Sequence, residues 1–137
     1  MSRLVIALAI VAVAVAVALV VRRRRPDAPT QRRGSVPAQL DRADFPRPES
    51  TWLVAVFTSA TCDTCADVAA KVAVLESDDV AVTEVEYGAF RTVHTRYRID
   101  AVPLTVIADD AGVVRHHFLG PVSATDLWAA VAAVRET

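Results

Sequence analysis

The two cysteines of the chain, Cys62 and Cys65, are the residues whose type and spacing most clearly predict chemistry. They stand between an apolar run at residues 52–57 and a helix-like segment at residues 66–76. A Cys-x-x-Cys between a strand and a helix is typical of thiol–disulfide exchange, in which one thiolate attacks and the other resolves the mixed disulfide. Because so short a ring gains little loop entropy, a purely structural disulfide is the weaker interpretation.

The helix that follows the first cysteine is predicted over residues 63–76. Its apolar positions Val68, Val72 and Leu75 recur at helical spacing. This places Cys62 at the helix N-terminus, where the partial positive charge of unpaired N–H groups favours thiolate over thiol. The sequence therefore predicts a reactive first cysteine.

The N-terminus carries a different signal, because residues 4–21 are uninterrupted apolar residues followed by four arginines at positions 22–25. As a helix this run spans about 27 Å, close to the hydrocarbon thickness of a bilayer. The arginines leave no small-x-small cleavage site, so we predict a retained transmembrane anchor at residues 1–25 rather than a cleaved signal. The basic flank predicts a single-pass protein with its body in the cytoplasm, and an extracytoplasmic body is the alternative.

Composition divides the rest of the chain. Residues 26–35 are polar, with Pro and Gly, and predict a flexible linker before a domain at residues 36–137. Residues 1–34 carry a formal charge of +6, whereas residues 35–137 carry −7. An acidic body is a poor candidate for nucleic-acid binding. The basic N-terminal segment predicts a lipid bilayer as its partner, because arginines are attracted to anionic lipid headgroups.

The body alternates strand-like and helix-like segments, which predicts an α/β fold with a mixed sheet and helices on both faces. Strands are predicted at residues 36–41, 52–58, 80–86, 103–108 and 113–118, and helices at residues 63–76, 89–97 and 125–134. The first of these is a short edge strand. Gly112 is expected to adopt a positive φ in the turn between the last two strands.

Over residues 36–135 the chain resembles the thioredoxin family. The Cys62–Cys65 motif follows a strand that ends in Phe57, and the segment at residues 97–103 is similar to the one that leads to the family's cis-proline. The hairpin turn at Gly112 and the glycine at position 120, before the last helix, also match. The resemblance implies a thioredoxin-like three-layer sandwich.

The resemblance also implies a function and a site. Cys62 would attack protein disulfides and the buried Cys65 would resolve the mixed disulfide, with no cofactor beyond the pair. Pro103 would be cis and lie against the sulfurs. Because proline lacks an N–H, the backbone of Val102 would pair with an extended substrate. A separate reductase or a low-molecular-weight thiol would supply electrons, and membrane proteins are among the expected substrates.

Three departures from the family pattern bear on catalysis. Thr61 replaces the usual Trp, Asp63 and Thr64 replace Gly-Pro, and Val56 replaces the buried acid that assists proton transfer from the resolving thiol. We predict that Glu84, which alternation places on the inner face of the next strand, supplies the missing carboxylate. Asp63 opposes a lowered thiol pKa, which predicts a comparatively reducing pair.

Two further functions stay open. The departures are also compatible with a binding or assembly module that has little catalysis, and the cysteines with a metal-delivery module. A bound metal is not favoured, because His116 and His117 point to opposite faces of their strand and His94 belongs to a separate helix. The three histidines are therefore expected to be solvated or partly buried.

Overall fold

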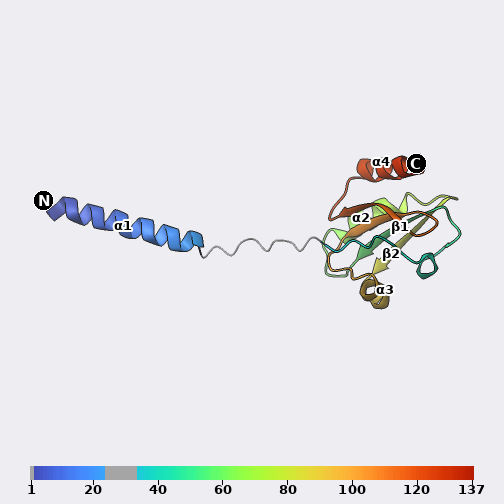
Figure 1. Ribbon diagram of the computed structural model, residues 1–137, viewed down its shortest axis with the longest axis horizontal. Helices are drawn as coiled ribbons and strands as arrows, with labels where there is room; N and C mark the ends of the chain where they lie inside the picture. Colours follow the sequence, from blue (N-terminus) through green and yellow to red (C-terminus); the bar gives the residue numbers. More distant parts are fainter. Residues whose placement is uncertain (1, 24–33) are drawn as a thin grey trace. The chain divides into compact units, whose positions relative to one another are not determined.

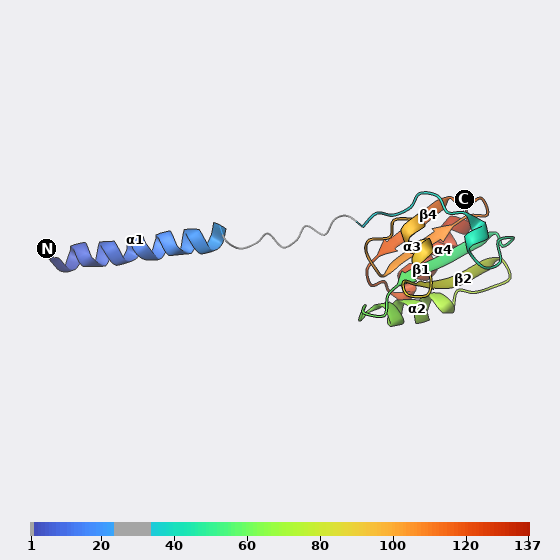
Figure 2. The same ribbon diagram turned by 90° about the horizontal axis from the view of Figure 1, so that it is seen from below.

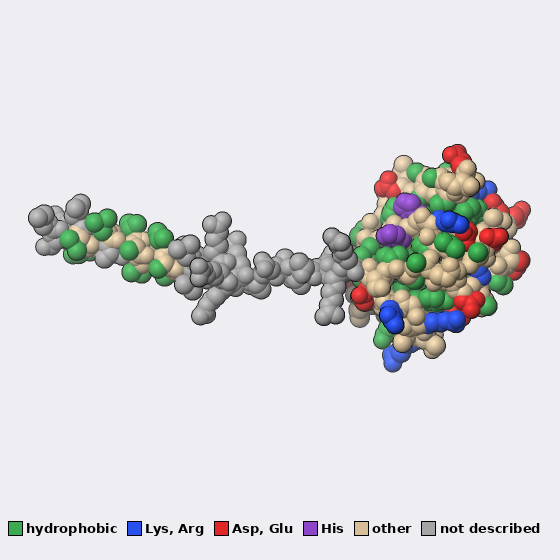
Figure 3. All heavy atoms as spheres, viewed as in Figure 1, with side chains coloured by type: hydrophobic (Ala, Val, Ile, Leu, Met, Phe, Trp, Pro, Cys, Tyr) green, Lys and Arg blue, Asp and Glu red, His purple; other side chains and the backbone are tan. Residues whose placement is uncertain are grey.

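The computed structural model describes residues 2–23 and 34–137. The chain divides into two compact units, with the boundary in the sequence after residue 33. The first unit contains helix α1 (Ser2–Arg23), whose described side chains at residues 5–8 and 10–17 are exposed and apolar (Figure 3). In the described part of the chain, no helix has both the length and the apolar character needed to cross a membrane. The anchor at residues 1–25 stays a prediction, and the predicted linker lies outside the described residues except for positions 34 and 35.

A four-stranded mixed sheet forms the centre of the body. Its strands are β1 (Trp52–Thr58), β2 (Val80–Glu86), β3 (Leu104–Ala108) and β4 (Val114–Leu119), in the spatial order β2-β1-β3-β4. β1 runs parallel to β2 and antiparallel to β3, and β3 pairs antiparallel with β4. Strands β1 and β2 have the predicted bounds, because β1 is a continuous apolar run, β2 alternates, and β-branched residues recur in both.

Three α-helices cover the two faces of this sheet (Figures 1 and 2). Helices α2 (Cys65–Ala73) and α4 (Ala124–Arg135) pack on one face, where Val68 and Leu127 join a core with Val54 of β1. Helix α3 (Arg91–Arg96) lies on the other face, and its Val93 packs against the second core. The predicted α/β fold with helices on both faces of a mixed sheet is thereby confirmed.

The edge strand predicted at residues 36–41 is absent from the described body. Only Gln39 forms a bridge, to Val113, and a short 3-10 turn η1 (Arg42–Asp44) follows. The Leu40 N–H donates to Gly112 O at 2.8 Å, so this segment satisfies its backbone at the β3–β4 turn. Gly112 has the predicted positive φ, +80°, and a Cβ there would lie 2.0 Å from Leu40 O.

Strand β2 is an edge of the sheet, because β1 is the one strand that pairs with it in the described body. The body shows charged side chains of both signs on the face in Figure 3. The carboxyl ends of β1 and β2 and the amino end of β3 lie together at one end of the sheet, since β3 is antiparallel to the other two. The cysteines follow β1 at this end.

Candidate active site at the Cys62–Cys65 disulfide

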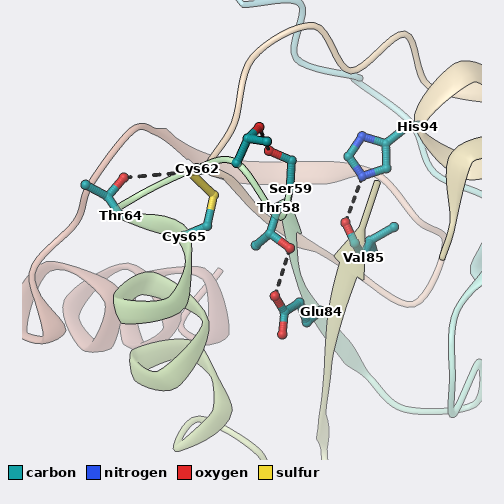
Figure 4. The surroundings of a disulfide bond; sticks show 9 residues. Thr58, Ser59, Cys62, Thr64, Cys65, Glu84, Val85 and His94 are labelled. Atoms are coloured by element: carbon teal, nitrogen blue, oxygen red, sulfur yellow. Dashed lines mark hydrogen bonds between the residues drawn. A yellow bond between two sulfur atoms is a disulfide. The ribbon is translucent and has the colours of Figure 1, made fainter. Parts of the chain in front are cut away.

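The two cysteines form a disulfide with Sγ atoms 2.16 Å apart and Cα atoms 5.5 Å apart (Figure 4). Cys62 is half-buried in the loop after β1, whereas Cys65 is the first residue of α2 and only 3% exposed. Backbone bonds from Cys62 N to Ser59 O and from Cys65 N to Cys62 O fold the loop into successive turns. One sulfur is therefore open to a partner and the other is shielded.

The position of Cys62 differs from the expectation that it begins a helix. Helix α2 starts at Cys65, because Asp63 and Thr64 adopt a turn instead, as short polar side chains often do. The unpaired N–H groups of the first helical turn thus lie nearer Cys65 than Cys62. The Thr64 hydroxyl oxygen is 3.9 Å from Cys62 Sγ, which makes it a local donor for a Cys62 thiolate.

The loop at Val102 and Pro103 lies at the same end of the sheet as the disulfide. Pro103 directly precedes β3, whose Leu104 pairs with Phe57 near the end of β1. The Val102–Pro103 peptide bond is cis, as the family resemblance implied. Pro103 O accepts from Gly120 N at 2.8 Å, whereas Val102 makes no backbone hydrogen bond with the rest of the described chain. Its N–H and C=O are therefore available to a partner.

Glu84 lies on the α2 side of the sheet, as alternation predicts. Its neighbour across the parallel pair is Val56, which is 1% exposed, so no carboxylate occupies the buried position itself. Glu84 Oε1 accepts a hydrogen bond from Thr58 Oγ1 at 2.8 Å (Figure 4). The exposed carboxylate lines a hollow of about 500 Å³ together with Val56 and Ala66, the residue after Cys65. The structure thus brings Glu84 close to the start of α2.

His94 lies at the candidate site and is 3% exposed, so the expectation that it would be solvated or partly buried is wrong. Its ring stands edge-on to Phe57 and Tyr87, with centroids 5.3 Å away in each case. The ring atom Nε2 lies 2.7 Å from Val85 O (Figure 4). Its spacing of three residues from the C-cap Tyr97 was a signal that could have placed it on an apolar stripe.

A groove of about 280 Å³ runs beside the disulfide on this α3 side of the sheet. Ser59 and Thr61 of the cysteine loop form one wall, Tyr87 and His94 form another, and residues 99–102 complete it. The Tyr87 N–H donates to Thr58 O at 2.9 Å and so ties the end of β2 to the start of the cysteine loop. The groove therefore lies between the cysteine loop and the loop before Pro103.

Other polar groups of the body are structural. Tyr97 donates a hydrogen bond to Asp44 and accepts one from Asp41 N; burial raises the pKa of Tyr97, and its bond to Asp44 adds to this effect. Arg96 pairs with both of these aspartates in a second hollow away from the cysteines. Within the described residues, no three His, Cys, Asp or Glu side chains are grouped as metal ligands would be.

Comparison with known proteins shows the fold. No protein-family model matches the chain, and no curated protein matches it. A mutant thioredoxin from Halobacterium salinarum superimposes with a TM-score of 0.55 and 21% identity over 63% of this chain and 76% of its own. A thioredoxin from Fasciola hepatica gives a TM-score of 0.53 and 24% identity over 61% and 81%, respectively. A malarial protein gives 0.54 and 14% identity over 61% and 97%.

The fold of the body is therefore thioredoxin-like. On this fold the Cys62–Cys65 disulfide lies in the loop after β1 and at the start of α2.

Proposed function

We propose that the chain is a thiol–disulfide oxidoreductase that acts on protein disulfides through Cys62 and Cys65. The observation that carries the proposal is the asymmetry of the pair, in which the half-buried residue Cys62 is bonded to Cys65, a residue that is 3% exposed. A protein disulfide reaches only the open sulfur, and the shielded one acts once the first is engaged.

In the forward reaction the Cys62 thiolate attacks one sulfur of the substrate disulfide and expels the other as a thiolate. The Cys65 thiol then loses its proton and attacks Cys62 Sγ, which releases the second substrate thiolate and forms the Cys62–Cys65 disulfide. Two electrons pass from the pair to the substrate. A separate reductase or a low-molecular-weight thiol returns the pair to the dithiol, and no other cofactor takes part.

Glu84 is our candidate for the proton acceptor of Cys65. It shares a solvent-open hollow with Ala66, and the Thr58 hydroxyl holds its carboxylate at 2.8 Å. A carboxylate so placed accepts the thiol proton directly or through one water molecule. This route replaces the buried acid whose position Val56 occupies.

Val102 is our candidate for substrate binding. Its backbone N–H and C=O are free of backbone partners within the described chain, and Pro103 next to it has no N–H to offer. An extended segment of the substrate that pairs with Val102 adds a short strand beside the cysteine loop. This pairing would orient the substrate disulfide toward Cys62.

The proposal includes attachment to a membrane, supported by the apolar residues 4–21 and the exposed side chains of α1. Attachment would confine the enzyme to membrane-proximal substrates, and the arginine-rich flank favours a cytoplasmic body. Protease protection of a tagged body in intact cells tests the orientation. Digestion of the body from outside supports the extracytoplasmic alternative, and recovery in the soluble fraction rejects attachment.

Reduction of insulin disulfides by the full-length chain tests the activity. We expect catalysis that Cys62→Ser abolishes, with a redox potential below that of strong oxidants such as DsbA at about −120 mV, since Asp63 opposes a stabilised thiolate. A potential near that value contradicts the reducing direction. Equal rates for wild type and Cys62→Ser reject the enzyme and favour the binding or assembly module, for which the buried apolar Val56 is the supporting observation.

A further inference from the structure

The groove on the α3 side of the disulfide offers hydrogen-bond acceptors and negative charge. Asp100 lies in its wall and is exposed; its Oδ1 accepts from Ser35 N at 2.9 Å. Among the described residues, no Lys or Arg forms a salt bridge with Asp100. The Asp100 carboxylate is therefore not engaged in an ion pair within the described residues.

His94 adds a buried acceptor to the same wall. A carbonyl oxygen only accepts hydrogen bonds, so the contact with Val85 O requires the proton of the neutral ring to sit on Nε2. Nδ1 is then an acceptor, and it bonds to no donor among the described residues. Figure 4 shows Nε2 directed at Val85 and the other ring nitrogen directed away from it. His94 is one of the residues that line the groove, and its Nε2 is already bonded to Val85 O.

The surrounding charges reinforce this character. Among the described residues, no Lys or Arg lines the groove, and Glu86, whose carboxylate lies close to the Ala60 backbone, adds a second negative charge at the cysteine loop. Arg91 stacks over the Tyr87 ring of the wall, with its Cζ 5.3 Å from the ring centroid. That guanidinium covers an aromatic face, so a bound cation would be drawn to Asp100 and His94.

We propose that this groove receives a basic side chain, Lys or Arg, that lies two residues from the disulfide cysteine of the substrate. The inference rests on the proposed exchange activity, because Val102 both lines the groove and is the backbone that would pair with the substrate. In an extended segment every second side chain points to the same face. A residue near the cysteine therefore reaches the groove while the disulfide meets Cys62. A volume of about 280 Å³ accommodates one such side chain.

The test uses three disulfide-linked peptides that differ only in having Lys, Gln or Glu two residues from the cysteine. The reduced full-length chain in detergent micelles is mixed with each peptide, and the second-order rate constant is measured by quenched flow. At low ionic strength we expect the Lys peptide to react about tenfold faster than the Glu peptide, with the ratio falling strongly in ~0.5 M salt. Equal rates for the three peptides overturn the proposal.

Asp100→Asn is the informative variant, because an Asn Oδ1 still accepts from Ser35 N while the charge is removed. We expect the Lys-to-Glu rate ratio to fall about threefold. Asp78→Asn is the matched control: it removes the same charge from an exposed residue before β2, about 20 Å away at the other end of that strand, and should leave the ratio unchanged. A fall of the same size in both variants contradicts a local site.

His94→Phe tests the acceptor separately, since it keeps a ring between Phe57 and Tyr87 but removes both nitrogens. We expect the Lys-to-Glu ratio to fall, whereas a purely structural role would slow all three peptides alike and lower the midpoint of thermal unfolding. If no peptide is reduced even by wild type, the proposed function fails and this inference with it. If all are reduced at equal rates, only the inference fails.

Discussion

The two faces of the sheet place different kinds of side chain near the disulfide. On the α2 side Val56 is buried and apolar, and the exposed Glu84 carboxylate lines the same hollow as Val56 and Ala66. On the α3 side a titratable ring, His94, is buried between aromatic side chains and lines a groove. The α2 side thus offers an exposed carboxylate, Glu84, whereas the α3 side offers a buried imidazole ring, His94.

This difference separates proton transfer from substrate recognition. A carboxylate at the rim is solvated and avoids the large cost of burying a charge, but its contact with the resolving thiol is less direct. A buried ring is fixed in orientation by its packing and by its bond to Val85 O. We therefore expect the α2 side to govern the rate of resolution and the α3 side to govern the choice of substrate.

The largest predicted effect separates the two sides at the sulfurs themselves. Cys65→Ser removes the resolving thiol and leaves the groove intact, so turnover should fall by at least about 100-fold while a mixed disulfide with Cys62 accumulates. Mass spectrometry of the protein after mixing with a peptide disulfide measures the adduct. Cys62→Ser is the control and should form no adduct. Adducts on Cys65 of that variant would show that the shielded sulfur is accessible and would break the assignment of roles.

Glu84→Gln sharpens the account of the α2 side. Loss of the acceptor should slow resolution about tenfold near neutral pH, with little change in the midpoint of thermal unfolding, because the side chain is exposed. Single-turnover kinetics that follow the decay of the mixed disulfide measure this step. Glu76→Gln is a matched control, since Glu76 lines the far part of the same hollow. An unchanged resolution rate in Glu84→Gln would remove Glu84 from the mechanism.

Sequence patterns predicted the framework well for a physical reason. Strand β1 is a buried apolar run and β2 shows strand-like alternation, so local sequence defines their ends, and the Ser123 N-cap marks the start of α4. The short edge strand predicted at residues 36–41 does not form. Its backbone partners lie at the β3–β4 turn, and tertiary contacts of that kind leave no periodic signal.

The site was predictable in its covalent parts and not in its surroundings. Cys62 and Cys65 are recognisable from their spacing, and the position of Glu84 follows from strand alternation. The groove draws its walls from four separate segments, at residues 59–61, 87, 94 and 99–102. Burial of His94 depends on Phe57 and Tyr87 meeting around it, so it becomes visible only in three dimensions.

Gly34→Val is predicted to disturb the α3 side from outside the groove. A Cβ at this position would lie 3.0 Å from Ala101 Cβ and 2.8 Å from Leu119 Cδ2, and the Ala101 methyl group cannot rotate away. We expect a loss of about 1 kcal/mol in the free energy of unfolding and a severalfold slower attack by Cys62, with resolution unchanged.

Denaturant unfolding and the same single-turnover kinetics measure both quantities for this variant. Ser35→Ala is the control, since the bond to Asp100 uses the Ser35 backbone N–H and survives the change. If resolution slows as much as attack, the two sides are coupled and the comparison fails.

The smallest expected effect concerns the turn that ends β2 on the groove side. Hydrogen bonds from the backbone N–H groups of Gly88 and Ala89 hold the pKa of Glu86 below its usual value. A depressed folded-state pKa contributes stability that is present above the unfolded value, about 4.3, and is lost as the pH falls through the folded pKa. Glu86→Gln should therefore lower the thermal midpoint slightly at pH 7 and have no effect at pH 2. A larger loss in acid than at neutral pH would mean that the carboxylate does not support this turn.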